Sequence, residues 1–129
     1  MKLGYTIIYV ANVVEAVKFY EAAFGIKRQF IHDSLLYAEM NTGQTTLAFA
    51  ANEAAEMGGL AIQPNTLSSL AAGWEICFVI DNVQEAYDHA IAQGSQPVIK
   101  PTLKPWGQTV SYVRDINGCL VEIASPVTS

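Results

Sequence analysis

Apolar and polar positions along the chain follow strand-like and helix-like periods in turn. The same order of strands and helix is predicted twice. Residues 3–10 form an apolar, β-branched run that predicts a strand. Asn12 follows as a candidate N-cap, with Glu15 three residues later in the pattern of a capping box. Apolar residues then recur at helical spacing as far as Gly25, a typical C-terminal stop. The strands predicted after this helix lie at about 27–33, 35–41 and 45–51.

The second half of the chain repeats this order about 70 residues later. An apolar run at 74–80 predicts a strand, and Asn82 with Glu85 restates the N-cap and its glutamate. The following helix is expected to end near Gly94. Each half therefore has the order β-α-β-β-β. The strands predicted after the second helix lie at about 96–100, 109–114 and 119–124, the last two joined by a hairpin turn at 115–118.

These two halves predict one α+β domain over residues 1–129, made of module 1–51, connector 52–73 and module 74–129. A helical turn is expected near 52–57 in the connector. One helix covers only one face of each small sheet, so two modules, within a chain or across a dimer, are expected to pair their open faces. The pairing predicts a curved mixed sheet around a ligand trough, and a homodimer as the oligomer.

Composition narrows the class of protein. Hydrophobic residues make up 51% of the chain and charged residues 15%, as in a well-buried globular domain. A net charge of −5 without a basic cluster argues against nucleic acid, and no apolar run is long enough for a bilayer. The apolar N-terminus is interpreted as a strand and not as a signal peptide. Cys77 and Cys119 lie in apolar runs, which predicts reduced core cysteines and a cytoplasmic location.

Three segments carry a resemblance to a known family: IIYVANVVEAVKFYEAAFG at 7–25, FVIDNVQEAYDHAIAQG at 78–94 and PWGQTVSYVRDINGCLVEI at 105–123. Together they resemble the vicinal oxygen chelate superfamily, which includes glyoxalases, fosfomycin-resistance enzymes, bleomycin-binding resistance proteins and extradiol dioxygenases. The resemblance spans nearly the whole chain and implies a glyoxalase-like fold. It does not select one function, because such folds host unrelated chemistries.

The resemblance also implies four metal-ligand positions on strands that line the trough. They fall on Tyr5, Ala48, Glu75 and Glu122, with Leu47 in place of Ala48 if the register shifts by one residue. The family has a His at the first and third positions and a Glu at the fourth, so only Glu122 keeps the expected type. Zinc or nickel would require the missing imidazoles, and magnesium or manganese would require more oxygen ligands. We therefore expect no cofactor, and a divalent metal is disfavoured.

Glu75 and Glu122 are the candidate catalytic residues, interpreted as two carboxylates that face the same trough. In the alternative interpretation, one or both simply face water or meet an arginine. His32 and His89 are the only imidazoles, and both are expected at the rim or on the surface. The aromatic candidates fit core packing equally well. The predicted ligand-binding residues are Tyr5, Tyr9, Ala48, Phe49, Glu75, Trp106 and Glu122.

Two functions agree with these residues. The first is a metal-free protein that binds a small organic ligand, cationic if the two carboxylates lie close together. The alternative is a lyase or isomerase of glyoxalase type that uses an atypical metal site or a carboxylate as general base. The sequence favours the binding protein, because the imidazoles of a metal centre are missing.

Overall fold

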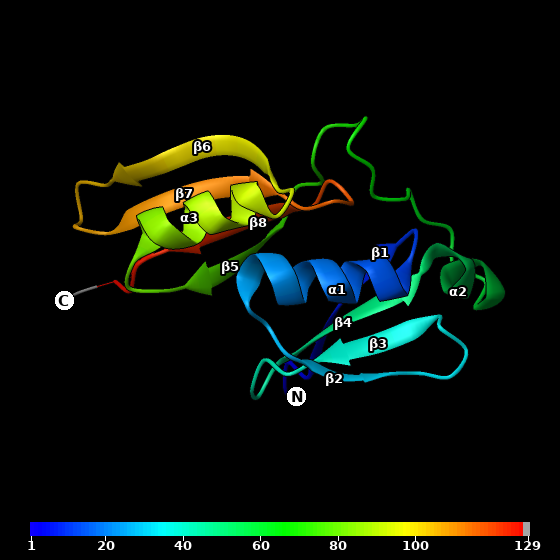
Figure 1. Cartoon of the computed structure of the whole chain (residues 1–129). Coiled ribbons are helices and arrows are strands. Elements are labelled where there is room, and N and C mark those ends of the chain that lie inside the picture. Colours follow the sequence, from blue (N-terminus) through cyan, green and yellow to red (C-terminus); the bar gives the residue numbers. More distant parts are fainter. Residues whose placement is uncertain (128–129) are drawn as a thin grey trace. The chain divides into compact units, whose positions relative to one another are not determined.

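The computed structural model describes residues 1–127 and divides the chain into two compact units, Met1–Asn65 and a second unit that begins at Thr66 (Figure 1). Each unit contains one βαβββ module. The boundary falls inside the predicted connector, so its first part belongs to the first unit and its second part to the second unit. The α+β class and the two modules of a glyoxalase-like fold are confirmed.

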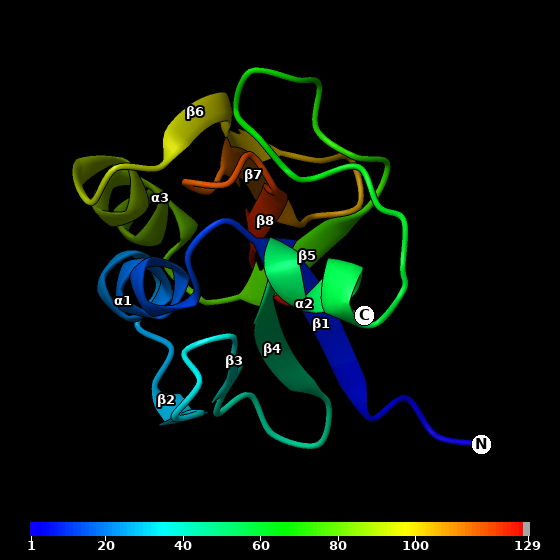
Figure 2. The ribbon, with the colours of Figure 1, turned by 90° about the vertical axis from the view of Figure 1, so that its right-hand side faces the viewer.

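The first unit is a four-stranded mixed sheet in the order β1-β4-β3-β2, whose strands lie side by side in this order in Figure 2. β1 is parallel to β4, while β3 is antiparallel to both of its neighbours. A short helix follows β4 where the helical turn was predicted. The elements are β1 (Tyr5–Val10), α1 (Val13–Phe24), β2 (Arg28–Ile31), β3 (Tyr37–Met40), β4 (Thr46–Ala51) and α2 (Asn52–Met57).

Helix α1 begins and ends where the sequence predicts. The Oδ1 atom of Asn12 accepts a hydrogen bond from the backbone N–H of Glu15 at 2.9 Å. Gly25 closes the helix in the left-handed conformation, at φ 67°. On the sheet side of the helix, the Tyr20 ring packs on the ring of Phe49 from β4, with centroids 4.9 Å apart. Both side chains are fully buried, so this contact is the centre of the first core.

The second unit repeats this arrangement with the sheet order β5-β8-β7-β6. β5 is parallel to β8, and β7 is antiparallel to both β8 and β6. Asn82 caps the helix as Asn12 does, with its Oδ1 atom 3.1 Å from the backbone nitrogen of Glu85. The elements are β5 (Glu75–Val79), α3 (Val83–Ala92), β6 (Gln96–Leu103), β7 (Thr109–Arg114) and β8 (Leu120–Ala124).

The β7–β8 turn holds the second unit's N-terminal segment against its sheet. The Arg114 guanidinium donates to the carbonyl of Gly118 within the turn. The same group also donates to three carbonyls of the segment that precedes β5, those of Thr66, Leu67 and Ser69. One arginine thus connects residues 66–69 to the hairpin, and its hydrogen-bonding capacity is directed at backbone oxygens.

Three predicted strands differ in length from the observed ones. β2 and β3 are each four residues long, because residues 32–36 form the hairpin turn between them, with Leu35 at φ 61°. β6 extends to Leu103 instead of ending near residue 100, although it contains Pro97 and Pro101. It is an edge strand, where a missing backbone N–H is tolerated. In residues 1–127, none of the helices is long and apolar enough to cross a membrane.

Candidate functional site

Each sheet has one face packed under its long helix, α1 or α3, and an opposite face. In the second unit, α3 packs against β6, β7 and β8. Val113, Val121 and Ile123 are buried and alternate with the side chains of the other face. We call that other face of the second sheet the open face. It contains both predicted carboxylates.

Strand register brings four side chains together on this open face. β5 and β8 pair Cys77 with Glu122, and β7 and β8 pair Tyr112 with the same Glu122. Glu75 lies two residues before Cys77 on β5, so its side chain emerges on the same face, diagonal to Glu122. Glu122 therefore has neighbours on both sides. We call Glu75, Cys77, Tyr112 and Glu122 the carboxylate cluster.

Glu122 lies at the centre of the carboxylate cluster. The Tyr112 hydroxyl donates to Glu122 Oε1 at 3.1 Å. The side chains of Glu75 and Cys77 lie close enough to the Glu122 carboxyl for it to raise the pKa of both. Two carboxyl groups can hydrogen-bond to each other only when one of them keeps a proton. A proton on one of these two neighbouring carboxyl groups would relieve the repulsion between them.

The pKa values of the donors agree with this geometry. Partial desolvation, together with the hydrogen bond and repulsion from Glu122, raises the pKa of Glu75 to about 7. Desolvation and the Glu122 carboxylate raise the pKa of Tyr112 to about 12 and that of Cys77 to about 11. At neutral pH, the phenol and the thiol therefore keep their protons, while Glu75 is close to half protonated.

No protein cation neutralises the two carboxyl groups. Within residues 1–127, neither Glu75 nor Glu122 forms an ion pair with a lysine, arginine or histidine. Arg114 lies in the same row of the sheet as Glu75, with Leu120 between them, but its guanidinium is bonded to backbone carbonyls. Within the second unit, therefore, neither carboxylate meets an arginine. Glu75 is also accessible to solvent.

The corresponding face of the first sheet has a different chemistry. Ala48 pairs with Ile7 and Glu39, as Glu122 pairs with Cys77 and Tyr112, so Ala48 and not Leu47 is the equivalent of Glu122. Glu39 is the only acidic residue on the four strands of this sheet. Its Oε2 atom accepts a hydrogen bond from the Tyr37 hydroxyl at 2.9 Å.

The predicted aromatic residues differ in how far they are buried. Phe49 is fully buried under α1, which favours the core-packing alternative for this residue. Tyr5 is 57% exposed on β1, and Tyr9 is half-buried on the same face. Trp106 is also exposed, in the β6–β7 turn, where its indole N–H donates to Gln108 Oε1 at 2.9 Å. His32 is at the surface, where its ring bonds to Ser34.

Sequence reasoning missed two members of the carboxylate cluster. Cys77 was predicted to be a core residue, which is wrong, because strand alternation places it on the open face with Glu75; Cys119 is buried as predicted. Tyr112 was not considered. The signal for it was available, because a hairpin closing at residues 115–118 pairs Tyr112 with Glu122.

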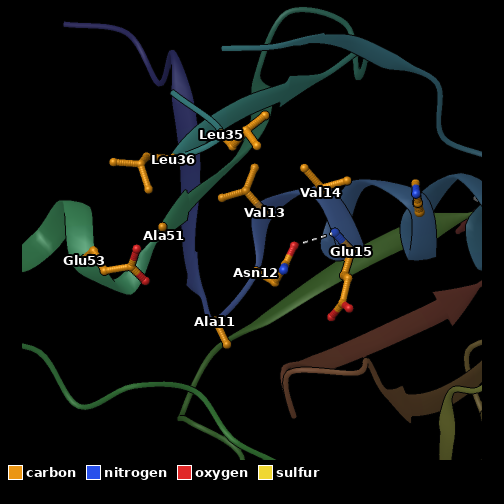
Figure 3. A pocket seen from close by; sticks show the side chains of 10 residues that line it. Ala11, Asn12, Val13, Val14, Glu15, Leu35, Leu36, Ala51 and Glu53 are labelled. Atoms are coloured by element: carbon orange, nitrogen blue, oxygen red, sulfur yellow. Dashed lines mark hydrogen bonds between the residues drawn. The ribbon is translucent and has the colours of Figure 1, made fainter. Parts of the chain in front are cut away.

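A pocket of about 550 Å³ lies in the first unit, beside the start of α1 (Figure 3). The β2–β3 turn forms one wall, and the junction of β4 with α2 forms another. Glu15, Lys18 and Glu53 supply charges of both signs, and the Asn12 side chain is already engaged as the helix cap. No sequence pattern predicted this pocket, and its mixed lining favours no class of ligand. It is lined by Ala11, Asn12, Val13, Val14, Glu15, Lys18, Leu35, Leu36, Ala51 and Glu53.

The fold and the two-module architecture define a class of protein, and comparison with known families identifies it. The model of the Glyoxalase/Bleomycin resistance protein/Dioxygenase superfamily matches residues 2–123. The chain therefore belongs to this superfamily, as the resemblance implied. A search of curated proteins gives no significant match.

Solved structures show the same fold at low sequence identity. A glyoxalase-related enzyme from Fulvimarina pelagi is 18% identical, with a TM-score of 0.83, over 98% of this chain and 88% of that one. A family enzyme from Burkholderia phytofirmans PsJN is 23% identical, with a TM-score of 0.79, over 99% and 100%. TioX from Micromonospora sp. ML1 is 19% identical, with a TM-score of 0.71, over 97% and 98%. At these identities the likeness shows the fold alone.

The donor atoms at the four family positions do not fit a metal. Ala48 has no donor atom, Tyr5 supplies a phenol in place of an imidazole, and only Glu75 and Glu122 supply carboxyl groups. Among residues 1–127, no group of three or more His, Cys, Asp and Glu side chains is arranged to hold a metal ion.

Proposed function

We propose that this protein binds a small organic cation at Glu75 and Glu122 on the open face of the second sheet. One observation supports the proposal above all others: two neighbouring carboxyl groups on one face of the sheet, one accessible to solvent, neither of them in an ion pair within residues 1–127. Such a pair is costly when both groups are ionised, and a cationic ligand removes that cost. Perturbed carboxyl groups of this kind are typical of functional sites.

Neighbouring side chains support the same ligand class. The Tyr112 hydroxyl holds Glu122 in place by donating to Oε1, which leaves the other carboxylate oxygens as acceptors. Cys77 and Tyr112 remain neutral at physiological pH, so they do not compensate the carboxylates. The cluster therefore offers acceptors and negative charge to a ligand that has N–H donors and a positive charge.

A second candidate function is proton transfer by Glu75 in a lyase or isomerase of glyoxalase type. The observation that favours it is the Glu75 pKa of about 7, which suits a general acid or base near neutral pH. Two structurally similar proteins are described as enzymes, one of them as glyoxalase-related. A turnover that disappears in Glu75→Gln, while ligand affinity is kept, would favour this function over binding.

The binding proposal is tested with benzamidinium as a cationic probe and benzamide as its neutral counterpart. We expect benzamidinium, and not benzamide, to raise the melting temperature at pH 8. The double change Glu75→Gln and Glu122→Gln should weaken benzamidinium binding about 100-fold, because it removes both charged acceptors. Glu39→Gln is the matched control, and its affinity should equal that of the unchanged protein. Equal shifts with both probes would overturn the proposal.

The same preparation tests the metal. We propose that the protein needs none, on the ground of the donor atoms described above. Elemental analysis of untreated protein should find well under one equivalent of zinc, nickel, iron or manganese per chain. About one equivalent would revive the glyoxalase-type enzyme. The homodimer, which light scattering would check, and the cytoplasmic location stay predictions.

A further inference from the structure

Four large apolar side chains are exposed at one end of the second sheet. β5 and β6 both end here, because β8 is parallel to β5 and the two antiparallel steps to β7 and β6 restore the same direction (Figure 1). Val79 and Ile80 lie at the β5 edge, and Leu103 and Trp106 at the β6 edge, each between 45% and 70% exposed. We call these four residues the strand-end patch. Exposed apolar side chains that gather in one place, unlike scattered ones, mark an interaction surface.

Hydrogen bonds across the strand ends connect the two edges of the strand-end patch. The Ile80 N–H donates to the Ala124 carbonyl of β8 at 2.8 Å. The carbonyl of the next residue, Ser125, accepts from the Gln108 side-chain amide, and Gln108 Oε1 accepts from the Trp106 indole N–H at 2.9 Å. Three strand spacings of about 4.8 Å separate the two edges, so the patch is about 14 Å wide. It is therefore one surface, and its indole ring is held in place.

An exposed tryptophan that is already held in place is well suited to bind a protein. Tryptophan is enriched among the residues that contribute most of the binding energy of interfaces. A side chain fixed by a hydrogen bond also loses less conformational entropy when a partner covers it. The strand-end patch therefore has an aromatic anchor at its β6 edge.

The border of the strand-end patch has opposite charges at its two edges. Asp81 follows Ile80 at the β5 edge, and Lys104 follows Leu103 at the β6 edge. Neither Asp81 nor Lys104 forms an ion pair within residues 1–127. Lys100, the other lysine of the second unit, also lies on β6. A surface that is negative at one edge and positive at the other is complementary to a copy of itself.

We propose that the strand-end patch is the contact surface between two copies of this chain, related by a two-fold axis perpendicular to the second sheet. A two-fold interface uses the same patch on both copies. With this axis, the β5 edge of one copy meets the β6 edge of the other, so Asp81 and Lys104 pair twice. A two-fold axis that lies in the sheet and across its strands would bring like charges together at both edges, which is unfavourable.

The size of the strand-end patch fits the centre of a small interface. A stable interface buries about 800 Å² on each partner, which corresponds to a surface about 30 Å across. The four apolar residues span about half of that width, and charged residues border them, as in interfaces with an apolar core and a polar rim. Glu75 lies at the opposite end of β5, so this contact is independent of the proposed cation binding. It assigns the homodimer predicted from the sequence to a particular surface.

Sedimentation-velocity ultracentrifugation of the whole chain tests the proposal over concentrations from about 1 μM to about 500 μM. The unchanged protein should form dimers. Trp106→Ala should raise the Kd of the dimer at least about 30-fold, because it removes the aromatic anchor from both copies. Trp74→Ala is the matched control, since Trp74 is an exposed tryptophan that precedes β5, at the opposite end of the sheet, and it should leave the Kd unchanged.

Charge reversal tests the orientation of the axis and leaves the apolar side chains in place. Lys104→Glu and Asp81→Lys should each raise the Kd about tenfold, because each change brings like charges together at two places in the dimer. The double change should return the Kd to within about threefold of its original value, because the pairs form again with their signs exchanged. A variant that merely disturbs folding would not be rescued in this way.

The outcomes separate the surface from its symmetry. A chain that stays monomeric at about 500 μM overturns the proposal. A dimer whose Kd is unchanged by Trp106→Ala also overturns it, because the interface then lies elsewhere. If the double charge reversal weakens the dimer further than either single change, the perpendicular axis is wrong. A monomer that loses more stability in urea through Trp106→Ala than through Trp74→Ala would show that another part of the same chain covers the patch, against a second copy.

Discussion

The two units have the same order of helices and strands. Equivalent positions carry similar residues on the helix-covered faces of the two sheets and different residues on the opposite faces. On the helix-covered faces, Phe49 in β4 and Ile123 in β8 occupy equivalent places, paired with Ile8 and Phe78, and both are buried. On the opposite faces, the first sheet has one acidic residue and the second has two. The repeat is therefore kept where the fold requires apolar side chains and diverges where the fold leaves the choice open.

The two sheets differ in the neighbours of one glutamate on each of these faces. In the first unit, Tyr37 donates to Glu39 two residues further along the same strand, and no second carboxyl lies on the sheet. In the second unit, Tyr112 donates across strands to Glu122, which also meets Glu75. The same phenol–carboxylate contact occurs in both, so the second carboxyl is the difference that creates the candidate site.

The largest expected effect concerns the helix-covered faces, where the two units have equivalent buried side chains. Phe49→Ala should cost about 3–5 kcal/mol of unfolding free energy, because it opens a cavity against Tyr20. Ile123→Ala should cost about 2–5 kcal/mol for the same reason. Urea denaturation measures both values. Tyr5→Ala, at an exposed position of β1, is the control and should cost less than about 1 kcal/mol. A mild effect at Ile123 would show that the two cores are not equivalent.

A smaller effect is expected at two equivalent turns, the one before β4 in the first unit and the one before β8 in the second. Gly43 and Gly118 both have φ 87°, where an L-residue is strained. A Cβ at Gly43 meets nothing within 4 Å, so Gly43→Ala should cost about 1 kcal/mol. A Cβ at Gly118 would lie 2.5 Å from the Thr66 carbonyl oxygen, so Gly118→Ala should cost about 3 kcal/mol. Similar losses in urea denaturation at the two sites would mean that residues 66–69 do not pack on the hairpin.

The sequence predicted the fold well because the signals for it are local. Asn12 and Asn82 cap their helices, and the left-handed Gly25 ends the first, as the sequence predicted. The pairing of strands was harder, since it depends on register. Cys77 was therefore assigned to the core from its apolar surroundings, although strand alternation puts it beside Glu75 on the other face.

The site was predictable only in part for the same reason. The repeat and the family resemblance pointed to Glu75 and Glu122, because these two positions can be found by counting along strands. The hydrogen bonds around Glu122 require the distances between side chains on three strands, which no local pattern contains. The pocket beside the start of α1 is lined by segments from three parts of the chain, so its existence depends on packing alone.

The smallest expected effect compares Glu75, on the open face of the second sheet, with Glu39, on the corresponding face of the first sheet. The pKa of Glu75 in the folded protein is about 7, above its ordinary value of 4.5, so the folded state binds this proton more tightly than the unfolded state. The stabilisation due to the proton is complete below about pH 4.5 and is lost as the pH rises through 7. Gln at this position does not titrate. Glu75→Gln should therefore be about 1 kcal/mol more stable than the unchanged protein at pH 8, a value reduced for solvent screening, since Glu75 is exposed.

Urea denaturation at pH 5, 7 and 8 measures this difference, which should grow with pH and vanish at pH 5. Glu39→Gln is the control, because Glu39 has a tyrosine and no second carboxyl beside it on its sheet. If both variants gain stability in parallel between pH 5 and 8, the gain reflects the reduced net charge of the chain and not the pair. A gain confined to Glu75→Gln would mean that the second carboxylate imposes a cost on the folded protein. A cost of that kind is expected at a position that serves ligand binding and not stability.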